Sequence, residues 1–154
     1  MTTPIIESIA ENIKDAINLI TTGNGFNQTL VAQRPKRSDF LNTAWDDLTV
    51  LVNQVDAEKP EGAIFATTWR QYFNITAIVI DSDDATASID TRLNQVSADI
   101  EKKLMADGTR GGNAIDTAII VKIPFFDDET AVTGIAVQVA VDYRTEIEDP
   151  YTKA

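Results

Sequence analysis

The stretch "GIAVQVAVDY", residues 134–143, alternates between branched or aromatic residues and small or polar ones. A period of two is typical of a β-strand that is buried on one face only. The apolar face carries Ile135, Val137, Val139, Val141 and Tyr143. The opposite face carries Gly134, Ala136, Gln138, Ala140 and Asp142. Strands of this kind belong to antiparallel sheets, so the stretch predicts such a sheet with one face on the core.

Four other segments are expected to complete the sheet. Residues 66–81 and 116–126 alternate in the same way, and shorter strands are predicted at 27–35 and 48–55. The first of these segments places Trp69, Phe73, Ile75, Ala77 and Val79 on one face. The second is predicted to place Ile119, Val121, Ile123 and Phe125 on one face. The acidic run "DDET", residues 127–130, then makes the turn into the final strand.

Two segments have the three- and four-residue spacing of amphipathic helices. The first begins near Ile5, with Thr3 as the expected N-cap and Pro4 in the first helical position. The second covers residues 89–106 behind Ser88, another expected N-cap. Helices do not alternate with single strands, so we expect an α+β fold. It would consist of a mostly antiparallel sheet with the N-terminal helix and the second helix packed on one face. Residues 1–145 form its single domain, followed by a polar tail, residues 146–154.

Composition excludes several classes of function. The 154 residues include no His and no Cys, so disulfides, thiolate–imidazole zinc sites and His-dependent nucleophilic catalysis are excluded. The net charge of −11 disfavours sequence-specific nucleic-acid binding, and the one basic cluster, "RPKR" at residues 34–37, is interpreted as a solvated strand end. No apolar run reaches the ~18 residues of a membrane span, and the N-terminus lacks the basic region of a signal peptide.

Acidic clusters are the only candidates for a metal site. Aligned from Asp81, an EF-hand loop fails at positions 5, 6 and 12, where the chain has Ala85, Thr86 and Arg92. The acidic residues before and within the start of the second helix are Asp81, Asp83, Asp84 and Asp90. We interpret them as complementing the helix dipole. The hairpin residues Asp127, Asp128 and Glu129 are interpreted as a solvated turn. We therefore expect no dedicated metal site in these clusters.

Two features point to assembly rather than chemistry. The small residues Gly134, Ala136 and Ala140 permit another element, of the same chain or of a neighbouring subunit, to approach closely. The tail that follows is too polar to bury much by itself, and it is expected to become ordered on assembly. The segment "GTRGG", residues 108–112, matches no phosphate-binding motif and is expected to expose Arg110 at the tip of a connecting loop.

The chain resembles the tail terminator proteins, also called minor tail or tail-completion proteins, of long-tailed bacteriophages. The resemblance covers most of the chain. It lies in the order of elements, in the "RP" at 34–35, in the helix "LNQVSADIEKKL" and above all in the closing run "VAVDYRTEIEDPYT", residues 139–152. It implies a non-enzymatic structural protein of the virion tail or neck, with no cofactor and no catalytic residue, assembled in the host cytoplasm. Such proteins form a ring, usually hexameric, that caps the tail tube, ends its polymerisation and joins it to the head connector.

The resemblance also implies the partners. They are further copies of the chain, the tail tube protein, the head–tail connector or neck protein, and genomic DNA that passes through the lumen without specific binding; no membrane is involved. The assembly-interface candidates are Tyr143, Arg144, Thr145, Asp149, Pro150, Tyr151 and Arg110.

Three alternatives stay open. One is another ring-forming neck, connector or tail tube protein, although a tube subunit is expected to carry a longer stacking loop than residues 107–115. Another is a metal-dependent hydrolase built on Asp81, Asp83, Asp127 and Asp128, and the third is a monomeric binding domain.

Overall fold

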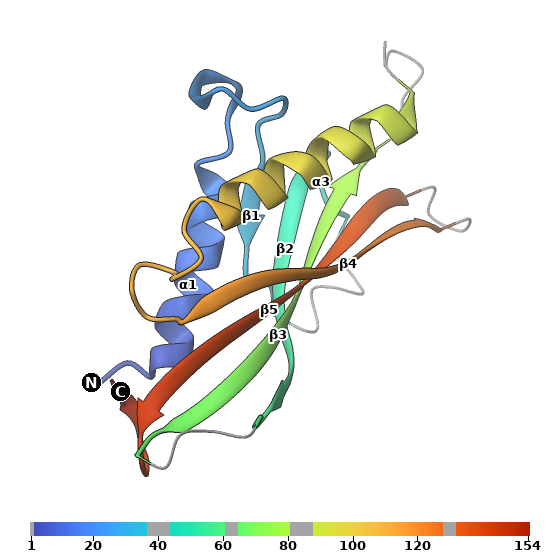
Figure 1. Ribbon diagram of the computed structural model, residues 1–154. Coiled ribbons are helices and arrows are strands. Elements are labelled where there is room, and N and C mark those ends of the chain that lie inside the picture. The colour runs from blue at the N-terminus through green and yellow to red at the C-terminus, as the bar shows by residue number, and fades with distance from the viewer. Residues whose placement is uncertain (1, 37–43, 61–64, 81–87, 128–131) are drawn as a thin grey trace.

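The computed structural model describes residues 2–36, 44–60, 65–80, 88–127 and 132–154. Within these residues the chain forms two α-helices, one 3-10 turn and a curled six-stranded sheet, which confirms the α+β fold (Figure 1). The elements in chain order are α1 Ile5–Asn18, the 3-10 turn η1 Thr22–Asn24, β1 Val31–Gln33, β2 Thr49–Glu58, β3 Thr67–Val79, α3 Ile89–Met105, β4 Asp116–Asp127, β5 Val132–Glu146 and β6 Asp149–Lys153.

The strands lie in the order β1-β2-β3-β5-β4, and β6 pairs with the end of β5. Among the strands of the described residues, only the short β1–β2 pair is parallel, so the predicted mostly antiparallel sheet is confirmed. The central pair is β3 with β5, which runs without a register shift from Thr67 opposite Thr145 to Val79 opposite Thr133. β5 is paired on both sides, and its alternation reflects the burial of its odd-numbered residues in the core.

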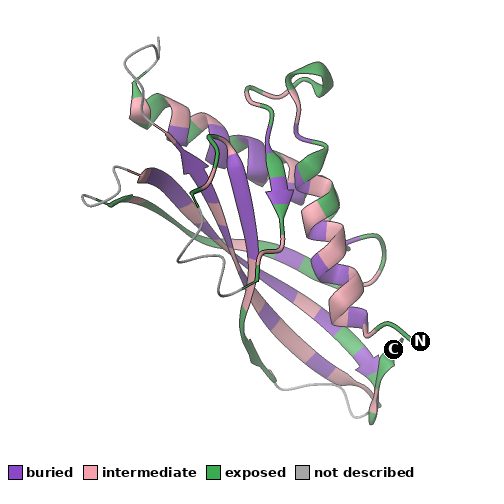
Figure 2. Cartoon of the chain, turned by 180° about the vertical axis from the view of Figure 1, so that it is seen from behind, coloured by how far each residue is buried: buried purple, intermediate pink, exposed green. Residues whose placement is uncertain are grey.

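Both helices cover the same face of the sheet, as predicted. Figure 2 shows buried residues alternating along the strands that the helices face. The completely buried core side chains of α1, α3 and the central strands include Ile9, Ile13, Ile17, Val96, Ile100, Leu104, Phe73, Ile75, Val137 and Val139. Full burial of one such side chain contributes about 1.5–3 kcal/mol. The apolar stripes of the helices and the odd-numbered face of β5 therefore form one core.

The two helices begin differently. Ser88 caps α3 as predicted, since its side-chain oxygen accepts a hydrogen bond from the Thr91 backbone N–H at 3.2 Å. The predicted start of α1 is wrong by one residue. Pro4, with ψ of 147°, occupies the N-cap position, and no side chain caps the helix. Pro4 therefore precedes the first turn, and the helix begins at Ile5 without help from Thr3.

The predicted single apolar face of β4 is wrong. Ile119 lies opposite Val139 on the core side of the sheet, but the pairing shifts between Ile119 and Val121. Beyond this bulge, Val121 and Ile123 lie opposite Gln138 and Ala136, on the face that the helices do not cover. One extra residue in a strand reverses the orientation of every side chain after it. The sequence of β4 alternates on both sides of the bulge, but the residues after the bulge face the other side of the sheet. The sequence alone does not show where this switch occurs.

Candidate assembly surfaces

The C-terminal tail has a defined place in the single chain, whereas we expected it to acquire one on assembly. It turns at Glu148, whose φ is 61°, and returns as β6 alongside β5. Lys153 lies opposite Thr145, and its side-chain nitrogen donates to the Gly112 carbonyl at 2.7 Å. The tail thus connects the end of β5 to the loop after α3.

The assembly-interface candidates in the closing run are divided between the core and the surface. Tyr143 is only 7% exposed and packs in the core, and Thr145 is 3% exposed, so neither offers a free contact surface in the single chain. Burial raises the pKa of the Tyr143 hydroxyl. Arg144, Pro150 and Tyr151 are exposed, and Asp149 is half-buried. These four residues remain candidates for contact with a partner.

The prediction that Arg110 is exposed is wrong, because the side chain is 1% exposed. Its Nη2 donates to the backbone carbonyls of Leu104 and Asp107, at the end of α3. The last carbonyls of a helix have no partner within the helix, so a guanidinium placed beneath them is a favourable donor. Its Nε and Nη1 have no hydrogen-bond partner among the described residues. Burial lowers the pKa of Arg110, and the Asp107 carboxylate partly offsets this effect.

The loop around Arg110 is organised by Asp107. Its carboxylate accepts hydrogen bonds from the backbone N–H of Thr109 at 3.0 Å and of Gly111 at 2.8 Å. The Thr109 hydroxyl donates to it as well, and these bonds lower the pKa of Asp107. The loop therefore fixes the end of α3 against the sheet, and it does not present Arg110 to a partner.

The small-residue face of β5 is partly covered by the chain itself. The ring of Phe125, on β4, lies against Gly134, its cross-strand partner. Ala140 is also buried, and Ala136 is half-buried. The small residues permit close approach by the same chain or by a neighbouring subunit. Over Gly134, that neighbour is β4 of the same chain.

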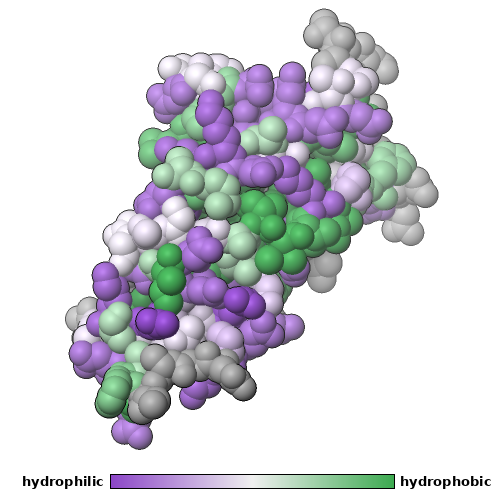
Figure 3. Space-filling model, in the orientation of Figure 1, coloured by the Kyte–Doolittle hydropathy of each residue, from purple (hydrophilic) through white to green (hydrophobic). Residues whose placement is uncertain are grey.

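The most apolar exposed surface lies on β4, and sequence reasoning missed it. Ile120, Val121 and Ile123, together the β4 patch, are between 40% and 54% exposed. Phe126, which is 62% exposed, lies opposite Thr133 on the face of the strand that turns towards α3. Figure 3 shows hydrophobic atoms gathered over the middle of this strand, which forms one margin of the sheet. A proline within a strand is typical of an edge strand, so Pro124 was the signal that could have placed β4 at the margin.

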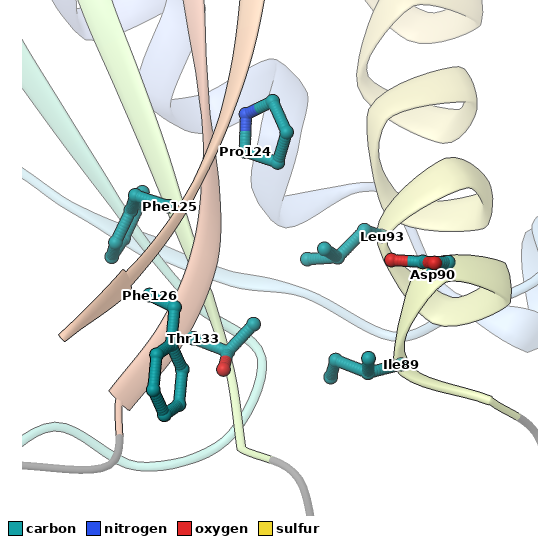
Figure 4. A pocket seen from close by; sticks show the side chains of 7 residues that line it. All are labelled: Ile89, Asp90, Leu93, Pro124, Phe125, Phe126 and Thr133. Carbon is teal, nitrogen blue, oxygen red and sulfur yellow. The ribbon is translucent and has the colours of Figure 1, made fainter. Parts of the chain in front are cut away.

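An apolar pocket of about 360 Å³ lies between the start of α3 and the ends of β4 and β5. Figure 4 shows Ile89 and Leu93 projecting from α3 towards the strands, while Phe125 points away from the helix. Its lining residues are Ile89, Asp90, Leu93, Pro124, Phe125, Phe126 and Thr133. The only carboxylate among them is Asp90, so the described lining residues include no pair of acidic groups for catalysis.

A polar pocket of about 430 Å³ lies between α1 and the margin of the sheet at β1 and β2. Arg34 donates to Glu7 at 2.6 Å, to Glu11 at 2.8 Å and to Gln54 at 3.1 Å. Its charge is therefore balanced by two carboxylates, which raise the pKa of Arg34. In place of the solvated strand end that we predicted, Arg34 joins α1 to β2 and is not free to bind an anion.

No group of three or more acidic residues that could hold a metal ion occurs in the described part of the chain. Asp127 ends β4, and Asp90 lies in the first turn of α3. The predictions for Asp81, Asp83, Asp84, Asp128 and Glu129 fall outside the described residues. None of the helices in the described ranges is long and apolar enough to cross a membrane.

Comparison with known proteins adds no family assignment. No protein-family model matches the chain, and no curated protein matches its sequence.

Proposed function

We propose that this protein is a structural virion protein whose copies form a ring, a hexamer, that caps the phage tail tube. The ring ends polymerisation of the tube and joins it to the head connector. The proposal derives from the resemblance of the closing run to tail terminator proteins. The observation that carries it is the β4 patch, an apolar surface on the margin of the sheet.

The β4 patch favours self-association on physical grounds. The edge of a sheet presents unpaired backbone N–H and C=O groups, and an apolar edge strand is a template for pairing with another chain. Burying apolar area contributes about 25 cal/mol per Å² removed from water. In a monomer the patch stays in water, whereas a ring covers it once in every subunit.

Two other features support the proposal. Arg144, near the end of β5, and Pro150 and Tyr151, in β6, lie exposed and offer a second contact surface for the tube or the connector. The net charge of −11 suits a ring through which DNA passes, because a like-charged lumen does not hold phosphates by releasing counterions.

Native mass measurement tests the proposal directly. We expect a hexamer, formed at high protein concentration or on the ends of purified tail tubes. Ile123→Lys places a charge in the β4 patch and should abolish the ring, while Met105→Lys, at a similarly exposed apolar position outside the patch, should leave it intact. A protein that stays monomeric and does not bind tube ends would overturn the proposal.

The same experiment separates the alternatives. A ring that binds connectors but not tubes would identify another neck protein, and a hexamer that polymerises would identify a tube subunit. The acidic hydrolase is tested by calorimetry with Mg²⁺ or Ca²⁺. Stoichiometric binding of either ion would support that function instead.

A further inference from the structure

We propose that the ring is closed by strand addition, in which the outer edge of β4 in one copy pairs with residues 52–58 of β2 in the next. This inference rests on the proposed function, because it names the surfaces that a ring of this chain would use. The binding partner of the β4 patch is then a second copy of the same chain.

The first step concerns the margin of the sheet at β1 and β2. β1 pairs only with residues 49–51 of β2, which leaves residues 52–58 without a paired strand on that side in the described chain. Arg34 reaches Gln54 there through side-chain atoms, so it leaves the backbone of β2 unpaired. The outer edge of β1 itself is occupied. The side chain of Asn18 accepts from the Ala32 backbone N–H at 2.8 Å and donates to its carbonyl at 3.2 Å. The open backbone at this margin therefore belongs to β2.

The second step concerns the opposite margin. β4 pairs with β5 only, so its outer edge is unpaired in the described part of the chain. Pro124 has no N–H to donate, which limits pairing to residues 117–123, a stretch that contains the bulge at Ile120. Residues 52–58 of β2 are comparable in length and contain a bulge of their own, between Gln54 and Ala57. The 117–123 stretch contains the β4 patch.

The direction of the strands fits a ring. β2 is antiparallel to β3, β3 to β5, and β5 to β4, so β2 and β4 run in opposite directions within one subunit. In a cyclic ring every subunit points the same way along the axis. A β4 strand placed beside the β2 strand of the next subunit is then antiparallel to it, which is the more stable kind of pair. This contact is head-to-tail, as ring closure requires.

Charge favours β2 over a second β4 strand. Full antiparallel pairing of two β4 strands places Asp116 of each copy opposite Asp127 of the other, and like charges opposite each other are destabilising. Between these two residues the only charged group is Lys122, which is bonded to Glu101 on α3. The open part of β2 carries only the acidic Asp56 and Glu58. Lys122 and Glu58 already have partners within the subunit, Glu101 and Tyr72. Pairing with β2 avoids the facing carboxylates of two β4 strands, and it brings the β4 patch beside the exposed apolar Val55.

Cross-linking tests the pairing cleanly, because the chain has no cysteine of its own. The protein carrying both Val55→Cys and Ile123→Cys is assembled, treated with a short bismaleimide and analysed on a denaturing gel. We expect a ladder of covalent oligomers up to the size of the ring. Each single variant alone should give no cross-link, and an equimolar mixture of the two should stop at dimers. A control with Val55→Cys and Met105→Cys should give no ladder.

The outcomes separate the interface from the function. Dimers from Ile123→Cys alone would show pairing of two β4 strands and overturn the inference. A ring seen by native mass without any ladder from the double variant would overturn the inference and leave the proposed function standing. Absence of a ring in the unmodified protein, at high concentration and on tube ends, would overturn both.

Discussion

Phe125 and Gly134 face each other across the β4–β5 pair, and the aromatic ring occupies the space of the missing side chain. A Cβ atom added at Gly134 would lie 2.5 Å from Cζ of Phe125 and 2.3 Å from the Ala77 carbonyl oxygen. Both distances are far below van der Waals contact. The relationship explains why the regular strand 134–143 begins with a glycine, since only this residue lets β3 and the ring come so close.

Gly134→Ala should therefore destabilise the protein by about 1–3 kcal/mol, the usual cost of overpacking. Urea unfolding followed by circular dichroism measures this change. Adding Phe125→Ala should not restore stability, because the clash with the Ala77 backbone remains. The control Gly23→Ala, whose Cβ would meet only the Thr21 hydroxyl at 3.8 Å, should change stability by less than about 0.5 kcal/mol. Equal stability of Gly134→Ala and the unmodified protein would contradict this packing.

Arg110→Ala should destabilise the fold by about 1–3 kcal/mol, because the terminal carbonyls of α3 lose a charged donor. The control Lys36→Ala removes an exposed cation and should have almost no effect on the urea midpoint. If the two variants unfold at the same urea concentration, Arg110 is exposed as the sequence suggested, and the buried position is incorrect.

Asp99→Ala should cost about 1–3 kcal/mol as well, and its effect should be local. Asp99 is buried on α3 and accepts hydrogen bonds from the Gln28 backbone N–H at 3.0 Å and from the Asn27 side chain at 3.1 Å. Its removal leaves the Gln28 N–H without a partner. Hydrogen exchange should therefore accelerate at Gln28 in the variant. Unchanged protection there would show that the bond does not hold this loop.

Deleting residues 146–154 should weaken ring assembly while leaving a folded domain. The tail adds the short β6 pairing and the bond from Lys153 to Gly112, whereas the β3–β5 pair and the core do not depend on it. Native mass should show fewer rings, and circular dichroism should show a nearly unchanged spectrum. Tyr151→Ala tests the exposed aromatic side chain alone, and Lys153→Ala controls for loss of the bond to Gly112. Normal assembly of the truncated protein would remove the tail from the interface.

Asp107 should contribute to stability at neutral pH and lose this contribution in acid. Its hydrogen bonds from Thr109 and Gly111 place the folded-state pKa below the ordinary value of 3.8. Between the two pKa values the unfolded chain binds more protons, so the contribution is fully present above pH 3.8 and disappears as the pH falls through the folded pKa. Urea unfolding of the unmodified protein and of Asp107→Asn should therefore differ more at pH 7 than at pH 2.5. A constant difference would contradict the assignment.

Residue periodicity was sufficient to predict much of the fold. The two-residue alternation of 134–143 and 66–81, and the three- and four-residue spacing around Ile9 and Val96, were confirmed as β5, β3, α1 and α3. The antiparallel sheet and the single helical face followed from them. These features were predictable because each depends only on side chains a few residues apart in the sequence. Their spacing shows directly whether they can lie on one buried face of a helix or a strand.

The features that tertiary structure decided depend on partners distant in the sequence. The bulge at Ile120 is defined only against β5, and it turns Val121 and Ile123 outwards to form the β4 patch. Arg110 is buried because the carbonyls at the end of α3 lie above its loop. Tyr143 lies in the core, as the alternation of residues 134–143 indicated, although its place in the closing run suggested an interface. The sequence by itself determined which faces are apolar, and the pairing of strands decided which of these faces stay exposed for a second chain.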